Sequence, residues 1–509
     1  PPRDTAFTLH MPDGTEISAK VCQEADKNNP AIGKSIMSNP NKVLGKWLLR
    51  DVFELEEGTV LTYEMLEKFG IDKRVISLVG ETEKEVQAQF SQMDDIMAYN
   101  QYKVLKVFQE NRISDLHFAW NTGYGYDDAG RDMIEKVYAE VFGAEKALCR
   151  PTIVNGTHAL ALIPLGLLRP GDELIYCTGA PYDTMQTVIG ITGYEPGNGS
   201  LKDYGVTYKQ VELLPDGNID FEALKNAIGP KTRMVTLQRS TGYGWRPAMT
   251  IDKIEEWARF MNNIDPTIIK MVDNSYGEFV DYKEPTEVGA DVMAASLIKN
   301  PGGGLALTGG YIAGKADLID KIQYRMTCPG IGGECGLTFG QTRSMFQGLF
   351  IAPRVVAGAV KGAILLGKCF EKLGYEVCPR PDEKRSDIIQ AIKLGDEERV
   401  VTFCQGVQEA APIDSHVTLV PWQMPGYEDP VVMAAGAFNQ GSSIELSADG
   451  PIREPFNVYF QGGITYEHSR MGVYGSINKM LKKGRSGFIT YTDKTCLRSS
   501  TIKGVRIMN

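Results

Sequence analysis

Cysteine is sparse in this chain of 509 residues, and none of its nine cysteines stands in a C-x-x-C pair. An odd number of scattered cysteines favours reduced thiols over a disulfide framework, and the missing pairs leave no zinc-type ligand set. The sequence therefore predicts no structural metal. The chain opens with Pro1-Pro2-Arg3 and has no basic-then-apolar leader. We interpret it as a fragment or processed chain, and expect a cytoplasmic protein.

Long apolar runs and an excess of basic charge are missing as well. Residues 159–168 and 355–366 form the longest apolar stretches, and Pro164 and Lys361 interrupt them. Both fall short of the roughly 20 residues that a bilayer span needs, so we expect no transmembrane helix. A formal net charge of −10 argues against general binding of polyanions by the whole molecule, although a local basic segment is compatible with it.

The composition is that of a folded multi-domain protein. Apolar residues make up 43% and charged residues 23% of the chain, close to globular averages. From about residue 130, strand patterns at 173–177, 234–238, 268–273 and 292–296 alternate with helical ones. This order predicts an α/β domain with a mainly parallel sheet, whose ligand site lies at the carboxyl ends of the strands. A long helix at 355–373 and strands near 400–404 and 417–420 predict a smaller second domain.

The first 78 residues have a different pattern. Alternating segments at 6–10 and 16–21 flank a Pro12-Asp13-Gly14 turn, which predicts a β-hairpin. Helical spacing follows over residues 41–55, and a charged helical stretch over 81–110 is interpreted as the join to the larger domain.

Two strand ends carry groups that suit a phosphorylated aldehyde cofactor. Asn155-Gly156-Thr157 precedes an apolar helix, and backbone N–H groups at a helix start bind phosphate. An ordinary strand-to-helix turn is the alternative. Asp273 ends an apolar strand, where a carboxylate can keep a pyridinium nitrogen protonated. A helix cap or a Mg²⁺ ligand would explain Asp273 equally well.

Lys299 and Arg453 complete the series. Lys299 follows the next strand and precedes three glycines, in a place where a lysine can form a Schiff base with an aldehyde. A P-loop is excluded, because its glycines would precede the lysine. Arg453 could hold the α-carboxylate of a substrate with two hydrogen bonds, or could simply be solvated. Phosphate turn, acid, lysine and arginine come in the order used by pyridoxal-5′-phosphate (PLP) enzymes of fold type I.

Longer blocks around these residues resemble one family. They lie at residues 122–128, 156–158, 238–240, 273–278, 296–304, 345–350 and 461–468. With them the chain, from about residue 94 to 481, resembles the methionine γ-lyase-like family often called aluminium-resistance proteins, within the cystathionine lyase and synthase group. The resemblance implies an aspartate-aminotransferase-like fold with a helical arm at 79–110, a large PLP-binding domain at 111–350 and a small domain at 351–481. Residues 482–509 stay unassigned.

The resemblance also implies roles for single residues. Lys299 would hold the cofactor, Asp273 would face the pyridine nitrogen, and the phosphate would be bound by Gly156, Thr157 and Ser296. Tyr182 could stack on the ring or could be a core tyrosine. A homo-oligomer, either dimer or tetramer, is implied as well. In the wider group a neighbouring subunit supplies phosphate contacts, for which the candidates here are Tyr124, Tyr126 and Arg131.

The implied reaction is elimination of a thiol from a sulfur amino acid. Loss from Cβ would give pyruvate and loss from Cγ would give 2-oxobutyrate, and the sequence leaves both open. Another PLP reaction, such as transamination, is the first alternative.

Residues 1–78 resemble a second family, the B3-like DNA-recognition domain of phospholipase-D-type restriction endonucleases, through residues 3–5, 20–24 and 38–52. Between residues 20 and 50 six Lys or Arg stand against two Asp or Glu. This resemblance implies duplex DNA as a partner, with phosphate contacts from Lys20, Lys42 and Lys46. A DNA-binding protein with a passenger enzyme is thus a further alternative. We also expect the chain from about Asp94 onward to fold and bind PLP without the amino-terminal part.

Overall fold

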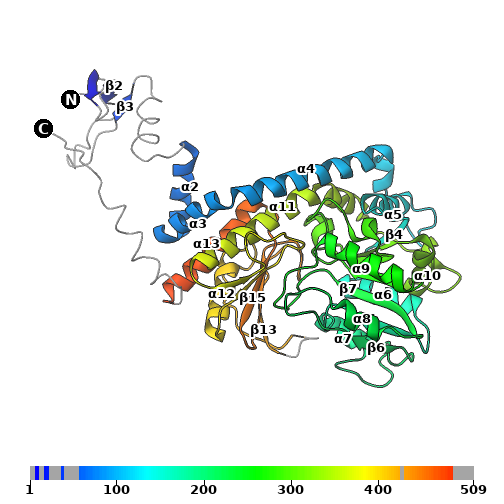
Figure 1. The fold of residues 1–509 in the computed structure, drawn as a ribbon. Helices are drawn as coiled ribbons and strands as arrows, with labels where there is room; N and C mark the ends of the chain where they lie inside the picture. The colour runs from blue at the N-terminus through cyan, green and yellow to red at the C-terminus, as the bar shows by residue number, and fades with distance from the viewer. Residues whose placement is uncertain (1–5, 11–15, 22–35, 39–56, 425–428, 485–509) are drawn as a thin grey trace. The chain divides into compact units, whose positions relative to one another are not determined.

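The computed structural model describes residues 6–10, 16–21, 36–38, 57–424 and 429–484 (Figure 1). The chain divides into two compact units, residues 1–77 and 78–509. Each unit is described by itself below.

The first unit contains a small antiparallel sheet in the order β1-β2-β3. Its strands are β1 (Ala6–His10), β2 (Glu16–Val21) and β3 (Ile36–Ser38), followed by helix α2 (Glu57–Lys68). Strands β1 and β2 pair with Ala6 opposite Lys20, so the predicted hairpin is confirmed. The helix predicted at 41–55 lies outside the described residues, as do Lys42 and Lys46.

The second unit is built on a seven-stranded sheet in the order β4-β10-β9-β8-β7-β5-β6. Its strands are β4 (Lys146–Arg150), β5 (Glu173–Tyr176), β6 (Thr207–Gln210), β7 (Thr232–Gln238), β8 (Ile269–Asp273), β9 (Val292–Ser296) and β10 (Gly310–Gly314). Neighbouring strands are parallel except at β10, which runs antiparallel to both β4 and β9. The four predicted strands are therefore confirmed as β5, β7, β8 and β9.

Helices cover this sheet. They are α5 (Ala129–Val141), α6 (Gly156–Leu167), α7 (Asp183–Ile189), α8 (Phe221–Ala227), α9 (Ile251–Ile264) and α10 (Ala316–Met326), with short 3-10 turns η2 (Asp115–Phe118), η3 (Pro285–Val288), η4 (Asn300–Gly302) and η5 (Gly332–Glu334). Ile163 of α6 and Ile322 of α10 are buried in one core cluster with Met234, Met271 and Ile312 of the sheet. Strands buried on both faces explain the continuous apolar runs of the sequence.

A second, antiparallel sheet in the order β11-β12-β15-β14-β13 forms the smaller domain. Its strands are β11 (Glu376–Cys378), β12 (Gln390–Lys393), β13 (Val431–Ala434), β14 (Ser447–Pro451) and β15 (Asn457–Gln461), and helices α12 (Glu397–Glu409) and α13 (Tyr466–Lys482) pack together beside it. The strand predicted at 400–404 is wrong, because these residues lie in α12, whose first turn is capped by Asp396. The strand predicted at 417–420 is also wrong, since that segment is irregular.

Helix α11 (Thr342–Lys372) runs through the second unit, and α4 (Gln87–Glu110) packs along it (Figure 1). Lys361 of α11 pairs with Asp94 of α4 at 2.6 Å, and Lys372 pairs with Glu85, in the last turn of α3 (Lys73–Glu85), at 2.6 Å. Within the described part of the chain, α11 is the one helix long and apolar enough to cross a membrane, yet 78% of its most apolar stretch is buried inside the molecule. Packing within the protein accounts for its composition.

Candidate active site

Three neighbouring strands end at one cavity. Strand β7 ends at Gln238, β8 ends at Asp273, and Lys299 follows three residues after β9. A cavity of about 300 Å³ brings Asp273 and Lys299 together with Gly156, Thr157, Tyr182 and Ser296. Six residues predicted from separate parts of the sequence thus share one site, at the carboxyl edge of the parallel strands.

Lys299 reaches the cavity from a half-buried position. Its Nζ lies 4.0 Å from the centre of the Tyr276 ring, close enough for a cation–π contact. Tyr276 itself has φ of +67°, which is strained for a non-glycine residue and places its ring against the lysine. Burial lowers the pKa of Lys299, and the carboxylates of Asp273, Glu278 and Asp449 oppose that shift. A lowered pKa increases the fraction of neutral, basic amine.

Asp273 is 8% exposed. Its Oδ1 accepts a hydrogen bond of 3.0 Å from the backbone N–H of Ser275. Burial raises the pKa of Asp273, while Lys299 and the bonds from Ser275 act in the opposite direction. A cation that comes next to a buried carboxylate, such as a protonated pyridine nitrogen, stabilises its ionised form.

The amino-terminal end of α6 forms the other side of the cavity. Asn155 caps this helix by accepting from the backbone N–H of His158 at 2.8 Å. The first N–H groups of a helix have no partner inside it, so those of Gly156 and Thr157 are available to an anion. A Cβ on Gly156 would lie 3.1 Å from Cβ of Ser296, tighter than an ordinary contact. The absence of a side chain at Gly156 therefore lets the start of α6 lie close to Ser296.

These groups fit PLP by their chemistry. Backbone N–H groups with the hydroxyls of Thr157 and Ser296 suit a phosphate, Asp273 suits a pyridinium nitrogen, and Lys299 suits an aldehyde. Tyr182 lines the same cavity and carries the aromatic ring that could stack on a planar cofactor. Among the described residues, no group of three or more His, Cys, Asp or Glu is arranged to hold a metal ion.

The smaller domain closes the cavity with residues that the sequence patterns did not reveal. Asp449 of β14 and Tyr459 and Gln461 of β15 line it. Gln461 Nε2 donates to Tyr276 Oη at 2.9 Å, and Tyr243 Oη donates to Asp449 Oδ2 at 3.1 Å. Gln461 opens the family block at 461–468, but only the fold of the second sheet over the first brings these three side chains to Lys299, so no local motif predicted that position.

Arg453 does not line the cavity that contains Lys299. It lies on an adjoining cavity of about 450 Å³, whose wall it shares with Arg246, Tyr182 and Tyr243. Its Nη1 is 3.2 Å from Oδ2 of Asp429. Because Tyr182 and Tyr243 line both cavities, the adjoining one is a lateral extension of the site.

The three candidates for contacts between subunits lie away from this cavity. Tyr124 and Tyr126 are 73% and 61% exposed, with ring centres 5.5 Å apart. Arg131 is buried and donates to the carbonyl oxygens of Gly125 and Gly336, at 2.5 and 3.4 Å. These bonds hold Arg131 within its own chain, where it fixes the loop that presents the two tyrosines.

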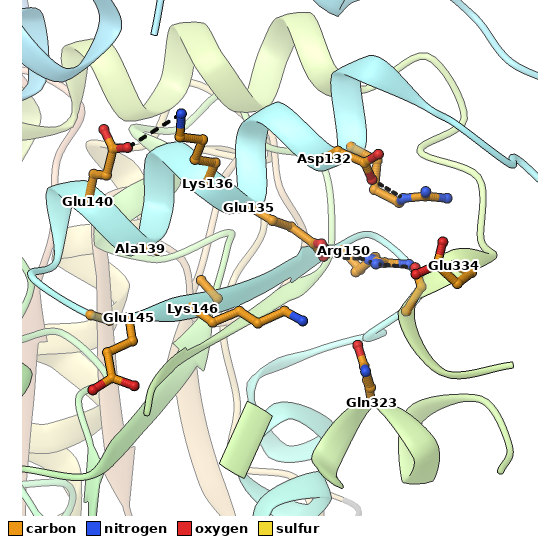
Figure 2. A pocket seen from close by; sticks show the side chains of 14 residues that line it. Asp132, Glu135, Lys136, Ala139, Glu140, Glu145, Lys146, Arg150, Gln323 and Glu334 are labelled. Atoms are coloured by element: carbon orange, nitrogen blue, oxygen red, sulfur yellow. Dashed lines mark hydrogen bonds and ion pairs between the residues drawn. The ribbon is translucent and has the colours of Figure 1, made fainter. Parts of the chain in front are cut away.

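Arg131 also borders a separate cavity of about 410 Å³ between α5, β4 and α10 (Figure 2). Its second arginine, Arg150, donates to Glu135 through Nε and Nη2. Nη2 also donates to the carbonyl oxygen of Gly333, and Nη1 donates to that of Cys335. The remaining pairs, such as Lys136 with Glu140, are on the surface. The guanidinium groups of Arg131 and Arg150 both have hydrogen-bond partners in the protein, so these bonds stabilise the walls of the cavity.

A mainly parallel α/β sheet with a cavity of this composition at the carboxyl edge of its parallel strands defines a PLP-dependent enzyme of fold type I. A family model described as methionine gamma-lyase matches residues 75–481. The chain belongs to this family, and it is a PLP-dependent carbon–sulfur lyase. The match begins about twenty residues before the family resemblance found in the sequence.

The two relatives with the higher identities below match this chain over about four-fifths of its length. An uncharacterized protein of Bacillus subtilis, YnbB, is 50% identical over 410 residues, which cover 80% of this chain and 97% of that protein. The crystal structure of a carbon-sulfur lyase involved in aluminum resistance from Clostridium novyi is 51% identical, with a TM-score of 0.79 over 82% of this chain and 99% of that one. The L-methionine gamma-lyase of Pseudomonas putida is 27% identical over 193 residues, or 38% of this chain and 42% of that enzyme.

Proposed function

We propose that this protein eliminates a thiol from a sulfur amino acid, with Lys299 as both the cofactor-holding residue and the base that moves the Cα proton. The observation that carries the proposal is the placement of Lys299 and Asp273 in one cavity with the start of α6. When bound, PLP supplies an electron-withdrawing ring that acidifies the Cα–H bond of an attached amino acid.

The protein residues supply binding and proton transfer. Gly156, Thr157 and Ser296 bind the phosphate, and Tyr182 covers the ring. Asp273 keeps the pyridine nitrogen protonated, because its buried carboxylate is stabilised by that positive charge. Lys299 Nζ accepts the Cα proton, and its lowered pKa supports the neutral amine that this step requires.

The leaving position defines the product. Loss of the thiol from Cβ gives pyruvate and ammonia, whereas loss from Cγ requires a second deprotonation at Cβ and gives 2-oxobutyrate. Both remain within the proposal. Arg453 is proposed as a carboxylate contact for a substrate long enough to enter the adjoining cavity, where its guanidinium lies.

We further propose a cytoplasmic homo-oligomer. The seven cysteines of the described residues are all free, as expected in a reducing compartment. Tyr124 and Tyr126 stand exposed on a loop held by Arg131, where a neighbouring subunit could receive them. Large exposed aromatic side chains of this kind are typical of contact surfaces. A role in tolerance of aluminium, which the Clostridium novyi relative's description states, is a proposal for this chain too.

Lys299→Ala tests the proposal. The wild-type protein should bind PLP with an absorption band near roughly 420 nm, where lysine-bound PLP absorbs, and should release thiol and keto acid in equal amounts. Lys299→Ala should lose both the band and turnover. Keto acid without thiol would indicate transamination, and a wild-type protein that cannot be loaded with PLP would refute the proposal.

A further inference from the structure

One wall of the cavity is a polar face of the small sheet. Strands β14 and β15 pair with Ser447 opposite Gln461 and Asp449 opposite Tyr459. Alternate residues of a strand point to the same side, so these four side chains form one face. Asp449, Tyr459 and Gln461 of this face line the cavity with Lys299.

Asp449 on this face is a buried carboxylate with an unused oxygen. The residue is 4% exposed. Its Oδ2 accepts from Tyr243 Oη at 3.1 Å, and its Oδ1 has no hydrogen-bond partner among the described residues. No salt bridge in that part of the chain includes it. Buried carboxylates are normally paired with a cation or with donors on both oxygens, so Asp449 has the character of a group that a ligand completes.

Asp449 lies in the same cavity as Lys299, and the two charges act on one another. Lys299 lies against the Tyr276 ring, and Tyr276 accepts a hydrogen bond from Gln461, which also donates to Ser447 Oγ at 3.1 Å. Asp449 is two residues beyond Ser447 on β14, which separates the two backbone positions by about 6 to 7 Å at the usual rise of a strand.

Its partner Tyr243 lines both the main cavity and the adjoining one. Through its bond to Tyr243, Asp449 therefore adjoins the wall that the two cavities share.

We infer that Asp449 is a specificity-determining residue, whose carboxylate accepts a protonated amino group that the substrate carries beyond its sulfur atom. The inference rests on the proposed function. The α-amino group of the substrate is used at Lys299, so the group that Asp449 recognises belongs to the far end of the side chain. Burial raises the pKa of Asp449 to about 6, and the carboxylate is thus ionised at neutral pH. A neutral side chain, such as that of methionine, leaves Oδ1 of Asp449 without a hydrogen-bond partner among the described residues.

Two substrates of equal size test this inference. S-(2-aminoethyl)-L-cysteine and S-propyl-L-cysteine differ only in a terminal ammonium against a methyl group, and the corresponding homocysteine derivatives serve if the enzyme eliminates at Cγ. We expect the wild-type holoenzyme to favour the amine, by kcat/KM, at least about tenfold at pH 7.5. The preference should fall as the pH drops through about 6, since protonated Asp449 no longer attracts a cation.

Asp449→Asn should reduce the ratio of the two kcat/KM values at least tenfold, mainly through KM, and should remove its pH dependence. Asp387→Asn is the matched control, because Asp387 is also a buried acid but binds the N–H groups of Thr241 and Ile389 and does not line the cavity. Its ratio should match that of the wild type.

Equal kcat/KM for the two substrates in the wild type would overturn the inference, and this comparison needs no variant to fold. An equal loss for both substrates in Asp449→Asn would also overturn it, by showing a structural role. If the wild type consumes neither these compounds nor any other sulfur amino acid, the proposed function itself fails.

Discussion

The pairing of Asp273 with the cofactor can be tested without removing the cofactor. Asp273→Asn preserves the size of the side chain and its bond to Ser275, so PLP binding should persist. An amide cannot stabilise a protonated pyridine nitrogen, and the ring then becomes a poorer electron acceptor. We expect turnover to fall at least about a hundredfold, the scale on which loss of one preorganised electrostatic contact acts. Absorbance and a keto-acid assay measure the two properties, and near-normal turnover would contradict the assignment.

The ionised carboxylate of Asp449 should also lower the stability of the folded protein. Its pKa of about 6 is above the ordinary 3.8, mainly because of burial. The folded state therefore binds this proton more tightly than the unfolded state, and the free energy of unfolding decreases as the pH rises from about 4 to about 6. At one pKa unit per about 1.4 kcal/mol, the full cost above pH 6 is at most roughly 3 kcal/mol.

Asp449→Asn should accordingly raise the thermal midpoint of the substrate-free protein at pH 7.5, and the gain should vanish near pH 4. A variant less stable than wild type at pH 7.5 would show that the carboxylate has a structural partner.

At the scale of elements, the loop that carries Lys299 is fixed by a glycine contact with α11. A Cβ on Gly348 would lie 2.2 Å from the carbonyl oxygen of Gly302, which is too close without a shift of backbone. Gly348→Ala should therefore displace the loop after Lys299, weaken PLP binding about tenfold or more, and lower the thermal midpoint. Gly229→Ala is the control, since a Cβ there meets nothing within 4 Å. Equal PLP affinity in both variants would show that the contact is not important for the site.

The elements differ in how well the sequence predicts them. The parallel strands and the residues at their ends were predictable, because a buried strand and the group that follows it are adjacent in sequence. Residues 400–404 were mistaken for a strand because Val400, Phe403 and Cys404 are apolar and compact, yet they are buried at helical spacing. Asp449 and Gln461 could not be predicted, since their roles depend on pairing between two strands and on the packing of one domain over another.

For the whole molecule, the enzyme unit begins earlier than the sequence suggested. Phe90 of α4 packs against Tyr466 of α13 with ring centres 5.4 Å apart. Glu83 accepts from Tyr466 Oη at 2.5 Å and pairs with Arg470 at 2.8 Å. A chain that begins at Asp94 would lose all of these contacts.

We therefore expect a chain beginning at Asp72 to fold, bind PLP and turn over like the full protein, and one beginning at Asp94 to melt several degrees lower. Thermal unfolding of both proteins, followed by absorbance of bound PLP, measures the difference. Equal midpoints would restore the boundary near Asp94. Binding of DNA by residues 1–78 stays a prediction, which gel-shift titration at several salt concentrations can address.

Helix α11 crosses the limit of residue 350 that separates the large and small domains in the sequence. The first turns of α11 contact the loop after Lys299, and its later turns pack against α13 and β12. A continuous helix of 31 residues, about 46 Å long at 1.5 Å per residue, thus belongs to both domains at once. Recombination between two relatives at residue 350 would join halves of two different helices, whereas a crossover at Gly374, just after the helix ends, would exchange the following strands and helices as an intact module.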